Sequence, residues 1–461
     1  MRALLLFFCL PFLGLTQTVS KKDQLKAKRI TANASTLFNE GQSTNAYMLL
    51  KQAVALDSNN ASAIFLLATT EHDLRSYFYA QEHCKKALKL LAKETNDEHL
   101  YLAAQIELAL GEVQTALQYI EQARLLLNSD KNFKLLGFAL LKQQCEFALN
   151  EQQKGENNRR QLLGGTLNTN YDEYGPILSN DSQTLYFTTR NPNAKGANLN
   201  PDDQRFFEDI YQAQPDAENN KLWVRNYSND EQLNTEGFDA LSYLSADQKS
   251  ALGTLNTTAS KEGSSKEMPT ESSDIFELSA EQPGVWDEKR LCTDIPGLNT
   301  SYFDGSPTKT DTIWIDEFTY IEELYFVSDR NSEKYATEIF VAKKINGVWQ
   351  AEVSALPQGI NTEGRETTPY ITPDGQFLFF ASDGHPGMGG YDIFYCQRNG
   401  KDWSAPVNLG GKVNSTLDDT HFQWNPTLQK ALWASVSEID GLFSYNLFEA
   451  ILNSGAFPFV K

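Results

Sequence analysis

The segment ITPDGQFLFFASDGHPGMGGYDIFYCQRNGKDWSAPVNLGGKVNS, residues 371–415, decides the fold. Its Pro-Asp-Gly turn joins two antiparallel strands. The apolar run after the turn, residues 377–382, is short and continuous, as expected for a strand buried on both faces. An acid, a second apolar run, a tryptophan and an Asn-Ser pair follow in that order. A single sheet of this kind keeps exposed edges and an uncovered face, so it needs similar sheets beside it.

Three markers of this segment recur in the same order beyond residue 160. The first is an apolar residue before Asn and Thr or Ser, with the asparagines Asn168, Asn234, Asn299, Asn361 and Asn414. The second is a polar turn leading into an apolar strand, at 179–190, 245–255, 322–330, 372–383 and 425–436. The third is an acid before an aromatic strand, at Asp209, Asp274, Glu338 and Asp392, with a weaker copy at Gly441-Leu442-Phe443. Four tryptophans lie 11 to 13 residues before the next asparagine marker: Trp223, Trp286, Trp349 and Trp403.

These positions are interpreted as structural. The acids are expected to bond backbone groups at the start of the strand that follows them. The tryptophans and the Asn-Thr/Ser pairs are expected to bracket the outer strand of each sheet and the link to the next sheet.

The number of sheets follows from the spacing of the asparagine markers. They lie 66, 65, 62 and 53 residues apart, so four complete units lie between five markers. A fifth set of inner strands follows at 420–448 without an outer strand, and the first marker, GGTLNT at 164–169, has no inner strands before it. If GGTLNT supplies the outer strand of the last sheet, both ends are satisfied. The sequence therefore predicts a β-propeller over 156–461 that has five blades and is closed by its own N-terminal strand, with six blades as the alternative.

Residues 20–155 carry a different, helical repeat. Alanines recur at a 34-residue step, as in Ala46 and Ala80, and the third unit continues at 36 with Ala116. Small side chains at fixed positions let two antiparallel helices approach closely, so three helix pairs are expected, with second helices at 46–56, 79–91 and 115–127 and a capping helix at 132–150. The groove of such a stack can hold a peptide or a helix. A spacer that only packs on the next domain is the alternative.

The first 19 residues have the form of a secretory signal peptide, with Arg2 before an apolar run, 3–15, and then small and polar residues. The run is shorter than the roughly 20 apolar residues of a membrane span, although an uncleaved anchor is the alternative. No later stretch is apolar enough to span a membrane. Four further cysteines lie far apart and are expected to be buried apolar side chains, although export would allow a disulfide: Cys84, Cys145, Cys292 and Cys396.

Charge and motifs bound the chemistry. The net charge of −20 argues against nucleic acid and anionic membranes as the main partners. The five histidines form no metal-binding spacing, and no nucleophile elbow, Walker loop or dinucleotide fingerprint is present, so we expect no catalytic residue, cofactor or metal. Acids in loops are compatible with Ca²⁺ as a weaker alternative: Asp181, Asp247, Asp374, Asp383 and Asp392. Insertions at 191–208, 256–273 and 309–318 are candidate contact loops, although the Ser/Lys/Glu-rich insertion at 256–273 is better interpreted as a flexible segment.

Residues 371–415 resemble the WD40-like propeller repeat of bacterial envelope proteins, best known from the Tol-system periplasmic propeller. The helical units resemble the tetratricopeptide repeat in length and alanine positions, although most of that family's Trp, Gly and Pro marks are missing; Gly111 does match its turn position. The combination is similar to envelope proteins of gliding, type IX-secreting bacteria. Many of those relatives carry a C-terminal peptidoglycan-binding domain of the outer-membrane-protein-A type, which is not expected here.

The resemblance implies an exported scaffold, periplasmic or associated with the outer membrane. It would dock envelope proteins through its helical groove and propeller face, beside a secretion or motility complex, without catalysis. The alternative is a propeller that interacts with carbohydrate or peptidoglycan, including a glycoside hydrolase with two or three carboxylates in the central funnel. The repeated acids argue against catalysis, because catalytic residues would be unique to one blade.

Overall fold

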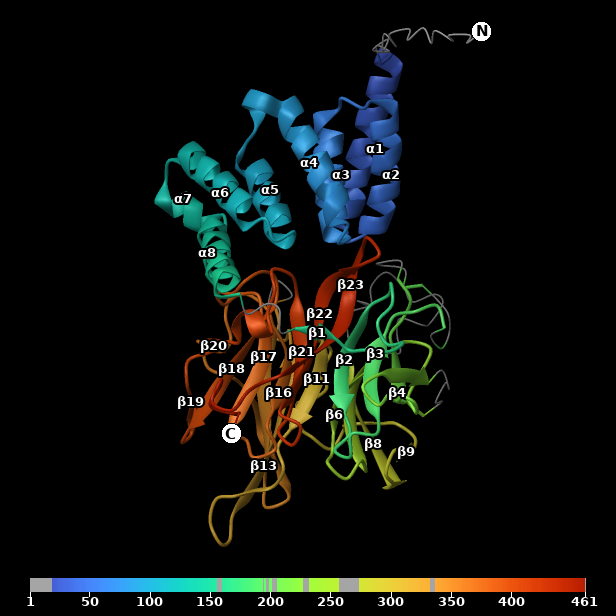
Figure 1. Ribbon diagram of the computed structural model, residues 1–461, viewed down its shortest axis with the longest axis vertical. Helices are drawn as coiled ribbons and strands as arrows, with labels where there is room; N and C mark the ends of the chain where they lie inside the picture. Colours follow the sequence, from blue (N-terminus) through green and yellow to red (C-terminus); the bar gives the residue numbers. More distant parts are fainter. Residues whose placement is uncertain are drawn as a thin grey trace, which may run out of the picture.

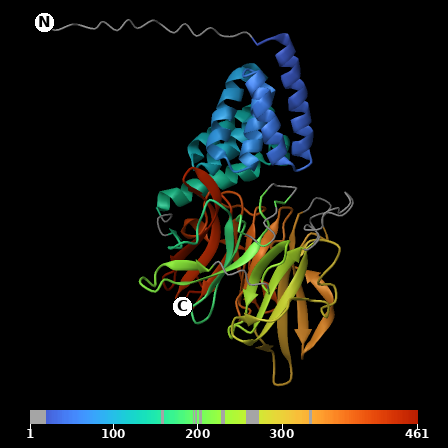
Figure 2. The same ribbon diagram turned by 90° about the vertical axis from the view of Figure 1, so that its right-hand side faces the viewer.

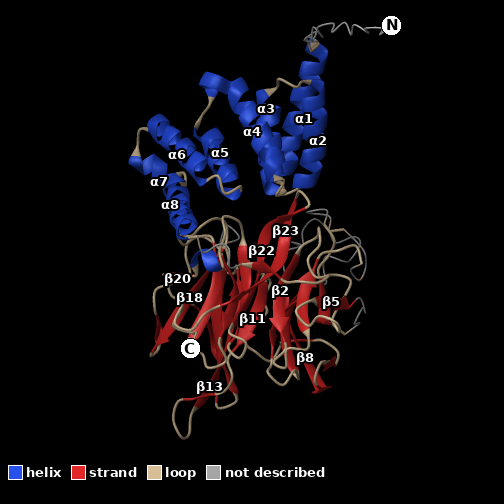
Figure 3. Cartoon of the chain, in the orientation of Figure 1, coloured by secondary structure: helices blue, strands red, loops and turns tan. Residues whose placement is uncertain are grey.

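The structure is a computed structural model that describes residues 19–155, 160–193, 195, 199–200, 205–226, 232–256, 273–331 and 336–460. All but the last residue of the predicted signal peptide lies outside these ranges. The helices form one layer, and the strands form a second layer beneath it (Figures 1 and 3).

The helical layer consists of antiparallel pairs in sequence order, as the alanine spacing predicts. Its helices in the described chain are α1 (Lys21–Asn39), α2 (Ser43–Leu56), α3 (Ala61–Asp73), α4 (Tyr77–Leu91), α5 (Asp97–Ala109), α6 (Val113–Leu127), α7 (Asp130–Leu135) and α8 (Phe138–Lys154). The repeated alanines of the second helices are fully buried where the pairs meet: Ala46, Ala53, Ala80, Ala87, Ala116 and Ala123. The region is therefore tetratricopeptide-like. None of the described helices is long and apolar enough to cross a membrane.

The predicted capping helix over 132–150 is wrong in one respect, because it is two helices. The break falls at Gly137, whose φ of +79° is left-handed and ends α7. A side chain there would also meet the Tyr101 ring, whose hydroxyl lies 2.9 Å from the position of a Cβ. Glycine therefore allows α8 to turn back against α6.

Five antiparallel sheets form the second layer, and the prediction of a five-bladed propeller is confirmed. Blade 1 contains β2 (Glu173–Leu178), β3 (Leu185–Thr189), β4 (Asp209–Pro215) and β5 (Trp223–Asn226). Blade 2 contains β6 (Phe238–Leu244), β7 (Ser250–Asn256), β8 (Asp274–Gln282), β9 (Val285–Trp286) and β10 (Arg290–Leu291). Blade 3 contains β11 (Asp304–Lys309), β12 (Ile313–Trp314), β13 (Tyr320–Ser328), β14 (Glu338–Ile345) and β15 (Val348–Ala355).

Blade 4 contains β16 (Glu366–Ile371), β17 (Phe377–Ser382), β18 (Asp392–Asn399), β19 (Asp402–Trp403) and β20 (Val407–Asn408). Blade 5 contains β21 (Asp419–Asn425), β22 (Lys430–Ile439), β23 (Leu442–Ile451) and, from the start of the propeller, β1 (Gln161–Leu162). The innermost strands β2, β6, β11, β16 and β21 contact one another in that order, and β21 returns to β2. They therefore enclose a central channel.

The ring closes as predicted, but through residues just before the predicted ones. Gln161 and Leu162 pair with Glu449 and Phe448 of β23, and the Leu163 N–H continues the ladder to Leu447. The GGTLNT segment instead crosses to blade 1, where Gly165 lies against Trp223. A Cβ on Gly165 would lie 1.9 Å from the Trp223 carbonyl oxygen, so only glycine permits this approach.

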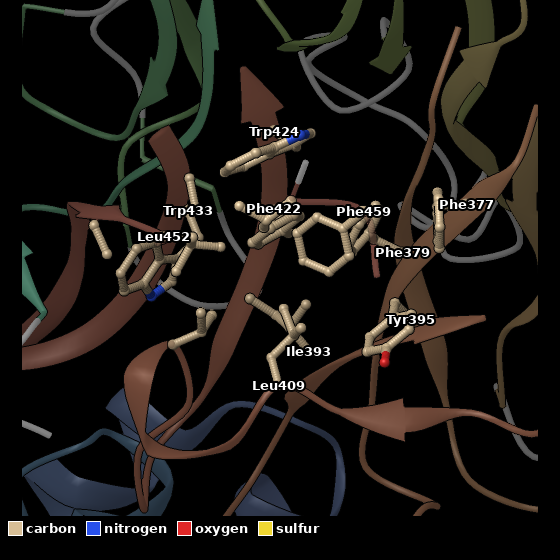
Figure 4. Close-up of a cluster of buried hydrophobic side chains, with 14 of the residues drawn as sticks. Phe377, Phe379, Ile393, Tyr395, Leu409, Phe422, Trp424, Trp433, Leu452 and Phe459 are labelled. Carbon is tan, nitrogen blue, oxygen red and sulfur yellow. The ribbon is translucent and has the colours of Figure 1, made fainter. Parts of the chain in front are cut away.

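The core lies between neighbouring blades, where second strands such as β17 are buried on both faces. Figure 4 shows the core between blades 4 and 5, with Phe459 inserted among the aromatic rings. Phe459 belongs to residues 453–460, which follow β23 and are called the C-terminal tail below. Its ring centroid lies 4.8 Å from that of Phe379 and 5.4 Å from that of Trp424. The tail therefore fastens the two blades together.

The two layers are packed together through blade 4 as well as blade 5. Met388, in the loop before β18, is buried in the core of the helical layer. The Gln144 side-chain amide of α8 donates to the Gly389 carbonyl at 2.7 Å, and Glu151 accepts from the Gly411 N–H at 3.0 Å. The views in Figures 1 and 2 agree that the helices lie over one end of the propeller. The glycine-rich GHPGMGG segment is thus a docking loop for the helices.

Candidate functional site

Two connected cavities lie between the helical layer and the helix-facing end of the channel. One, of about 590 Å³, lies in the channel mouth, and the other, of about 270 Å³, lies between the α3–α4 turn and blades 1 and 5. They share four lining residues: Arg75, Asp172, Arg190 and Arg205. We call the two together the junction cleft. A third cavity of about 210 Å³ lies towards the opposite end of the channel.

Arg75 brings the helical layer into the channel mouth. It lies in the turn between α3 and α4 with a φ of +59°, held by the Ser76 N–H bond to Glu71. Its guanidinium pairs with Asp172 at 2.8 Å and stacks over the Tyr445 ring, 4.4 Å from the centroid. A side chain from the α3–α4 turn of the helical layer therefore forms part of the polar floor of the channel mouth.

The Asp172 carboxylate is the centre of this polar floor. One oxygen accepts from Arg75 and from the Tyr445 N–H, and the other pairs with Arg205 at 2.9 Å. Burial would raise the pKa of Asp172, but the two guanidinium groups and the Tyr445 N–H lower it below its ordinary value. The carboxylate is thus held ionised, which suits accepting hydrogen bonds and not donating a proton.

Aromatic side chains form the outer rim of the cleft. Phe443, at the tip of the β22–β23 hairpin, contacts Tyr77 and Phe78 of α4 with ring centroids 4.9 and 5.3 Å apart. Phe78 and Tyr79 are exposed, the latter by 62%. Tyr171 stands on the propeller side of the cleft, exposed and edge-on to Phe206. The cleft therefore combines aromatic walls with a charged, hydrogen-bonded floor.

A small cavity of about 10 Å³ lies among the innermost strands, lined in part by Gly175, Thr368 and His421. His421 lies there in the left-handed region, with a φ of +55°, at a bulge of the innermost strand β21. Its N–H donates to Thr368 of blade 4 at 3.0 Å, and Tyr174 of blade 1 lies beside its ring. Burial lowers the pKa of His421 to about 3, so the imidazole is neutral at pH 7. The imidazole that lines this small cavity is thus uncharged.

The predicted repeat positions lie away from the cleft, at equivalent places in the blades. In each blade, the side-chain amide of the asparagine marker bonds to the backbone of one third-strand residue, as a neighbouring strand would. The amide oxygen accepts from the backbone N–H, and the amide nitrogen donates to the backbone carbonyl. The pairs are Asn168 with Leu447, Asn234 with Ile210, Asn299 with Ile275, Asn361 with Ile339 and Asn414 with Ile393. The tryptophans lie on outer strands and pack into the cores between blades: Trp223, Trp286, Trp349 and Trp403.

The four predicted acids begin the third strand of blades 1 to 4. Asp392 accepts from the Met388 and Gly389 N–H groups, and Asp209 accepts from the Lys195 N–H, so both face the loop before the strand rather than the strand itself. Glu338 accepts from the Asn331 side chain at 2.8 Å. Asp274 is partly exposed at the start of β8, and burial beside Asp304 raises its pKa.

A second set of acids, not predicted from the sequence, lies at the first or second position of each innermost strand. They are fully buried, and each accepts from the backbone and hydroxyl of the Thr or Ser four residues earlier: Glu173, Asp239, Asp304, Glu366 and Asp419. The constant Thr/Ser-x-x-x-acid spacing is a signal that would have found them.

A lysine or arginine forms an ion pair with this buried acid in blades 1, 2, 3 and 5. These residues are Arg225, Lys289, Arg330 and Arg160, in that order of blades. Blade 4 differs, because Glu366 accepts from Ser382 and Thr362, and the nearby His385 bonds to the Ile360 carbonyl.

The loop acids considered for Ca²⁺ have other partners. Asp181, Asp247 and Asp374 each accept from a Ser or Thr two residues earlier and from a backbone N–H two residues later. Asp383 pairs with Arg365 at 2.8 Å. Within the described ranges, no group of three potential metal ligands occurs. The described part of the candidate contact loop 191–208 includes Arg205, Phe206 and Glu208, which line the junction cleft. The candidate loop 256–273 lies outside the described residues except at its two ends.

The four cysteines that follow the predicted signal peptide are buried and unpaired, consistent with their interpretation as apolar side chains.

No family model matches this chain, and no curated protein matches it. Similar solved structures include tetratricopeptide-repeat proteins and arabinan-cleaving enzymes. The second tetratricopeptide-repeat domain of Spaghetti (RPAP3), bound to an HSP90 peptide, is 21% identical over 23% of this chain and 95% of that chain, with a TM-score of 0.22. A GH43 endo-arabinanase from Bacillus licheniformis is 11% identical over 63% of this chain and 97% of its own, with a TM-score of 0.38. An α-L-arabinanase from Penicillium chrysogenum is 9% identical over 64% and 98%, with a TM-score of 0.33.

Proposed function

We propose that this protein is a non-enzymatic interaction scaffold of the bacterial cell envelope, which binds an extended segment of a partner protein in the junction cleft. The observation that carries the proposal is the composition of that cleft. Tyrosine, phenylalanine and arginine are enriched at protein interfaces, and tyrosine and arginine are frequent hot spots there. Here exposed aromatic rings surround a floor of arginines held in place by Asp172.

The contacts of the cleft favour binding over catalysis. Asp172 is ionised and already paired with two arginines, and Asp329 accepts from the Phe303 N–H at 2.9 Å. His421 is neutral and holds the Thr420 hydroxyl through Nδ1 at 2.9 Å. These groups are positioned to hold a ligand and its backbone, and each already has a structural contact. Export is proposed from the signal-like N-terminus, and a place beside a secretion or motility complex from the resemblance of the repeats.

Affinity isolation from cross-linked envelopes of the source cells tests this function. We expect a partner to co-purify in stoichiometric amount with the wild-type chain and to be lost from a Tyr79→Ser/Tyr171→Ser variant. Both tyrosines are exposed, so the fold should survive. Leu25→Ser, a change at another exposed side chain on α1, is the control and should keep the partner. Equal recovery from the tyrosine variant and the control would contradict binding in the cleft.

The enzymatic alternative rests on three carboxylates that line the channel mouth: Asp172, Glu208 and Asp329. It is tested by incubating the pure chain with peptidoglycan and with a panel of soluble polysaccharides. The scaffold proposal expects no released sugar. Turnover that disappears in Asp329→Asn, while the circular dichroism spectrum is unchanged, would replace the scaffold by a hydrolase.

A further inference from the structure

A second apolar surface lies on blade 3, at the end of the propeller away from the helices (Figure 1). Its centre is the insertion between β11 and β13, which projects beyond the sheet as a hairpin. The large apolar side chains there are exposed, Trp314 by 64% and Phe318 by 84%, together with Ile315, and Val348 on the adjoining β14–β15 turn is exposed by 65%. We call Trp314, Ile315, Phe318 and Val348 the blade 3 patch.

The patch is held in one conformation. Ile315 bonds to the Thr319 carbonyl, and Asp316 caps the turn by accepting from the Phe318 N–H at 2.8 Å. Tyr320 and Asn346 exchange two hydrogen bonds, which tie the hairpin to the β14–β15 turn. These bonds order the backbone of the hairpin on folding, so binding need not supply that part of the ordering entropy.

The hairpin is also fixed to its neighbours. Trp314 lies edge-tilted against Tyr320, with centroids 5.2 Å apart. The Asp311 N–H bonds to the Pro373 carbonyl of blade 4, and Ile313 lies against Gly375, where even a Cβ would come within 2.7 Å. Two blades thus hold the patch, so it does not fold back to cover its own apolar groups.

The charge beside the patch selects its occupant. Asp311, Asp316 and Glu317 are exposed on the same hairpin, and no described lysine or arginine forms an ion pair with them. Of the basic residues on the same sheet, Lys343 and Lys344 pair with Glu323 and Glu322, and Lys309 lies over the Tyr243 ring. An anionic bilayer would be repelled, and two copies of this chain would bring two sets of carboxylates together. An apolar pocket with a basic rim would bury the rings and pair the acids.

We propose that the blade 3 patch is a docking surface for a second protein whose apolar pocket is rimmed by lysine or arginine. This inference goes beyond the junction cleft and gives the scaffold two binding ends, one at the helices and one at the far end of the propeller. The patch and the cleft share no residue, so a change in one leaves the other free to bind.

The test uses the full chain with photoreactive benzoylphenylalanine in place of Phe318, and a matched chain with the same group in place of Val285, which is 63% exposed on β9. Both are irradiated in the cells that make the protein. We expect one protein to cross-link from position 318 and not from position 285. No such protein, or the same protein from both positions, would overturn the proposal.

Calorimetry on the purified pair then separates the apolar and charged contributions. Trp314→Ser/Phe318→Ser should weaken binding by about 30-fold, as expected for loss of a central aromatic anchor. Asp316→Asn/Glu317→Gln should weaken binding less and should reduce the loss of affinity between 50 and 300 mM salt, because fewer charge pairs are screened. An affinity unchanged by the first variant, or independent of salt, would overturn the proposal.

Two further measurements address the other occupants. Sedimentation with phosphatidylethanolamine–phosphatidylglycerol vesicles and analytical ultracentrifugation of the chain alone are expected to show neither lipid binding nor association through the patch. Lipid binding or dimer formation that Trp314→Ser/Phe318→Ser abolishes would assign the patch to a membrane or to a second copy instead.

Discussion

Replacing Phe459 by alanine tests whether the C-terminal tail fastens blades 4 and 5. The ring is 6% exposed and lies against Phe377, Phe379, Tyr395, Phe422 and Trp424. Removing a buried phenylalanine costs about 3–5 kcal/mol, including the cavity that it leaves. Residues 453–460 belong to no strand and can shift to fill part of that space, so we expect the lower figure, about 3 kcal/mol. For a propeller of about 300 residues the unfolding entropy is about 0.6 kcal/mol/K, so Tm should fall by about 5 °C.

The assay is urea unfolding of the full chain followed by tryptophan fluorescence, since Trp424 contacts Phe459 directly. Hydrogen exchange should show lost protection in β21 and β22 before other blades are affected. Phe457→Ala is the matched control, because Phe457 is only partly buried and contacts Phe459 from outside, and it should cost about 1 kcal/mol. A Phe459→Ala free energy of unfolding within 0.5 kcal/mol of the wild type, or equal to that of the control, would refute the role of the tail.

Two further predictions concern buried carboxylates. Glu173→Gln should lower the free energy of unfolding by about 3–5 kcal/mol, because it leaves the buried Arg225 without its charge partner. Glu366→Gln should lower it by only about 1–2 kcal/mol, because the donors to Glu366 are hydroxyls and one N–H. Urea unfolding of both variants measures this contrast, and equal losses of stability would contradict it. Arg75→Met should cost about 1–3 kcal/mol at pH 7, since Asp172 keeps Arg205. Because the pKa of Asp172 is lowered in the folded state, its ion pairs stabilise the fold fully above the unfolded pKa of about 3.9, and this stabilisation is lost as the pH falls further. The difference in free energy of unfolding between the wild type and Arg75→Met should therefore become smaller from pH 5 to pH 2. A difference that stays constant over this range would contradict the ion pair between Arg75 and Asp172 as its cause.

The repeating parts of the fold could be predicted because each blade has the same backbone groups to pair and the same apolar strand to cover. Asn361 replaces a missing strand neighbour through its side-chain amide, and the run 377–382 must be covered on both faces, so both leave a periodic mark in the sequence. The predicted position of the closing strand was a few residues too late in the sequence. The reason is that the close approach of Gly165 to Trp223 is a contact between two segments and leaves no periodic mark. The second set of buried acids was missed although its spacing is regular.

The junction cleft and the C-terminal tail could not be predicted in the same way. Arg75 and Asp172 lie 97 positions apart, in two domains with different repeats, so neither period brings them together. Phe459 follows the last strand and has no counterpart in another blade. Non-repeated contacts of this kind build the candidate site, whereas repeated contacts build the frame that holds it. The blade 3 patch lies in an insertion that the sequence does mark, but its exposure is known only from the structure.

The pairing of β1 with β23 also governs when the propeller can be completed during synthesis. Asn168 and Leu447, which bond to each other at this joint, are 279 positions apart, so the first segment of the domain waits for the last. Bringing such distant segments together costs loop-closure entropy before their contacts stabilise the fold. A chain interrupted before β23 would keep an unsealed strand edge at each end, and such edges promote aggregation. Synthesis of β23 therefore precedes the last step of folding, in which the ring closes.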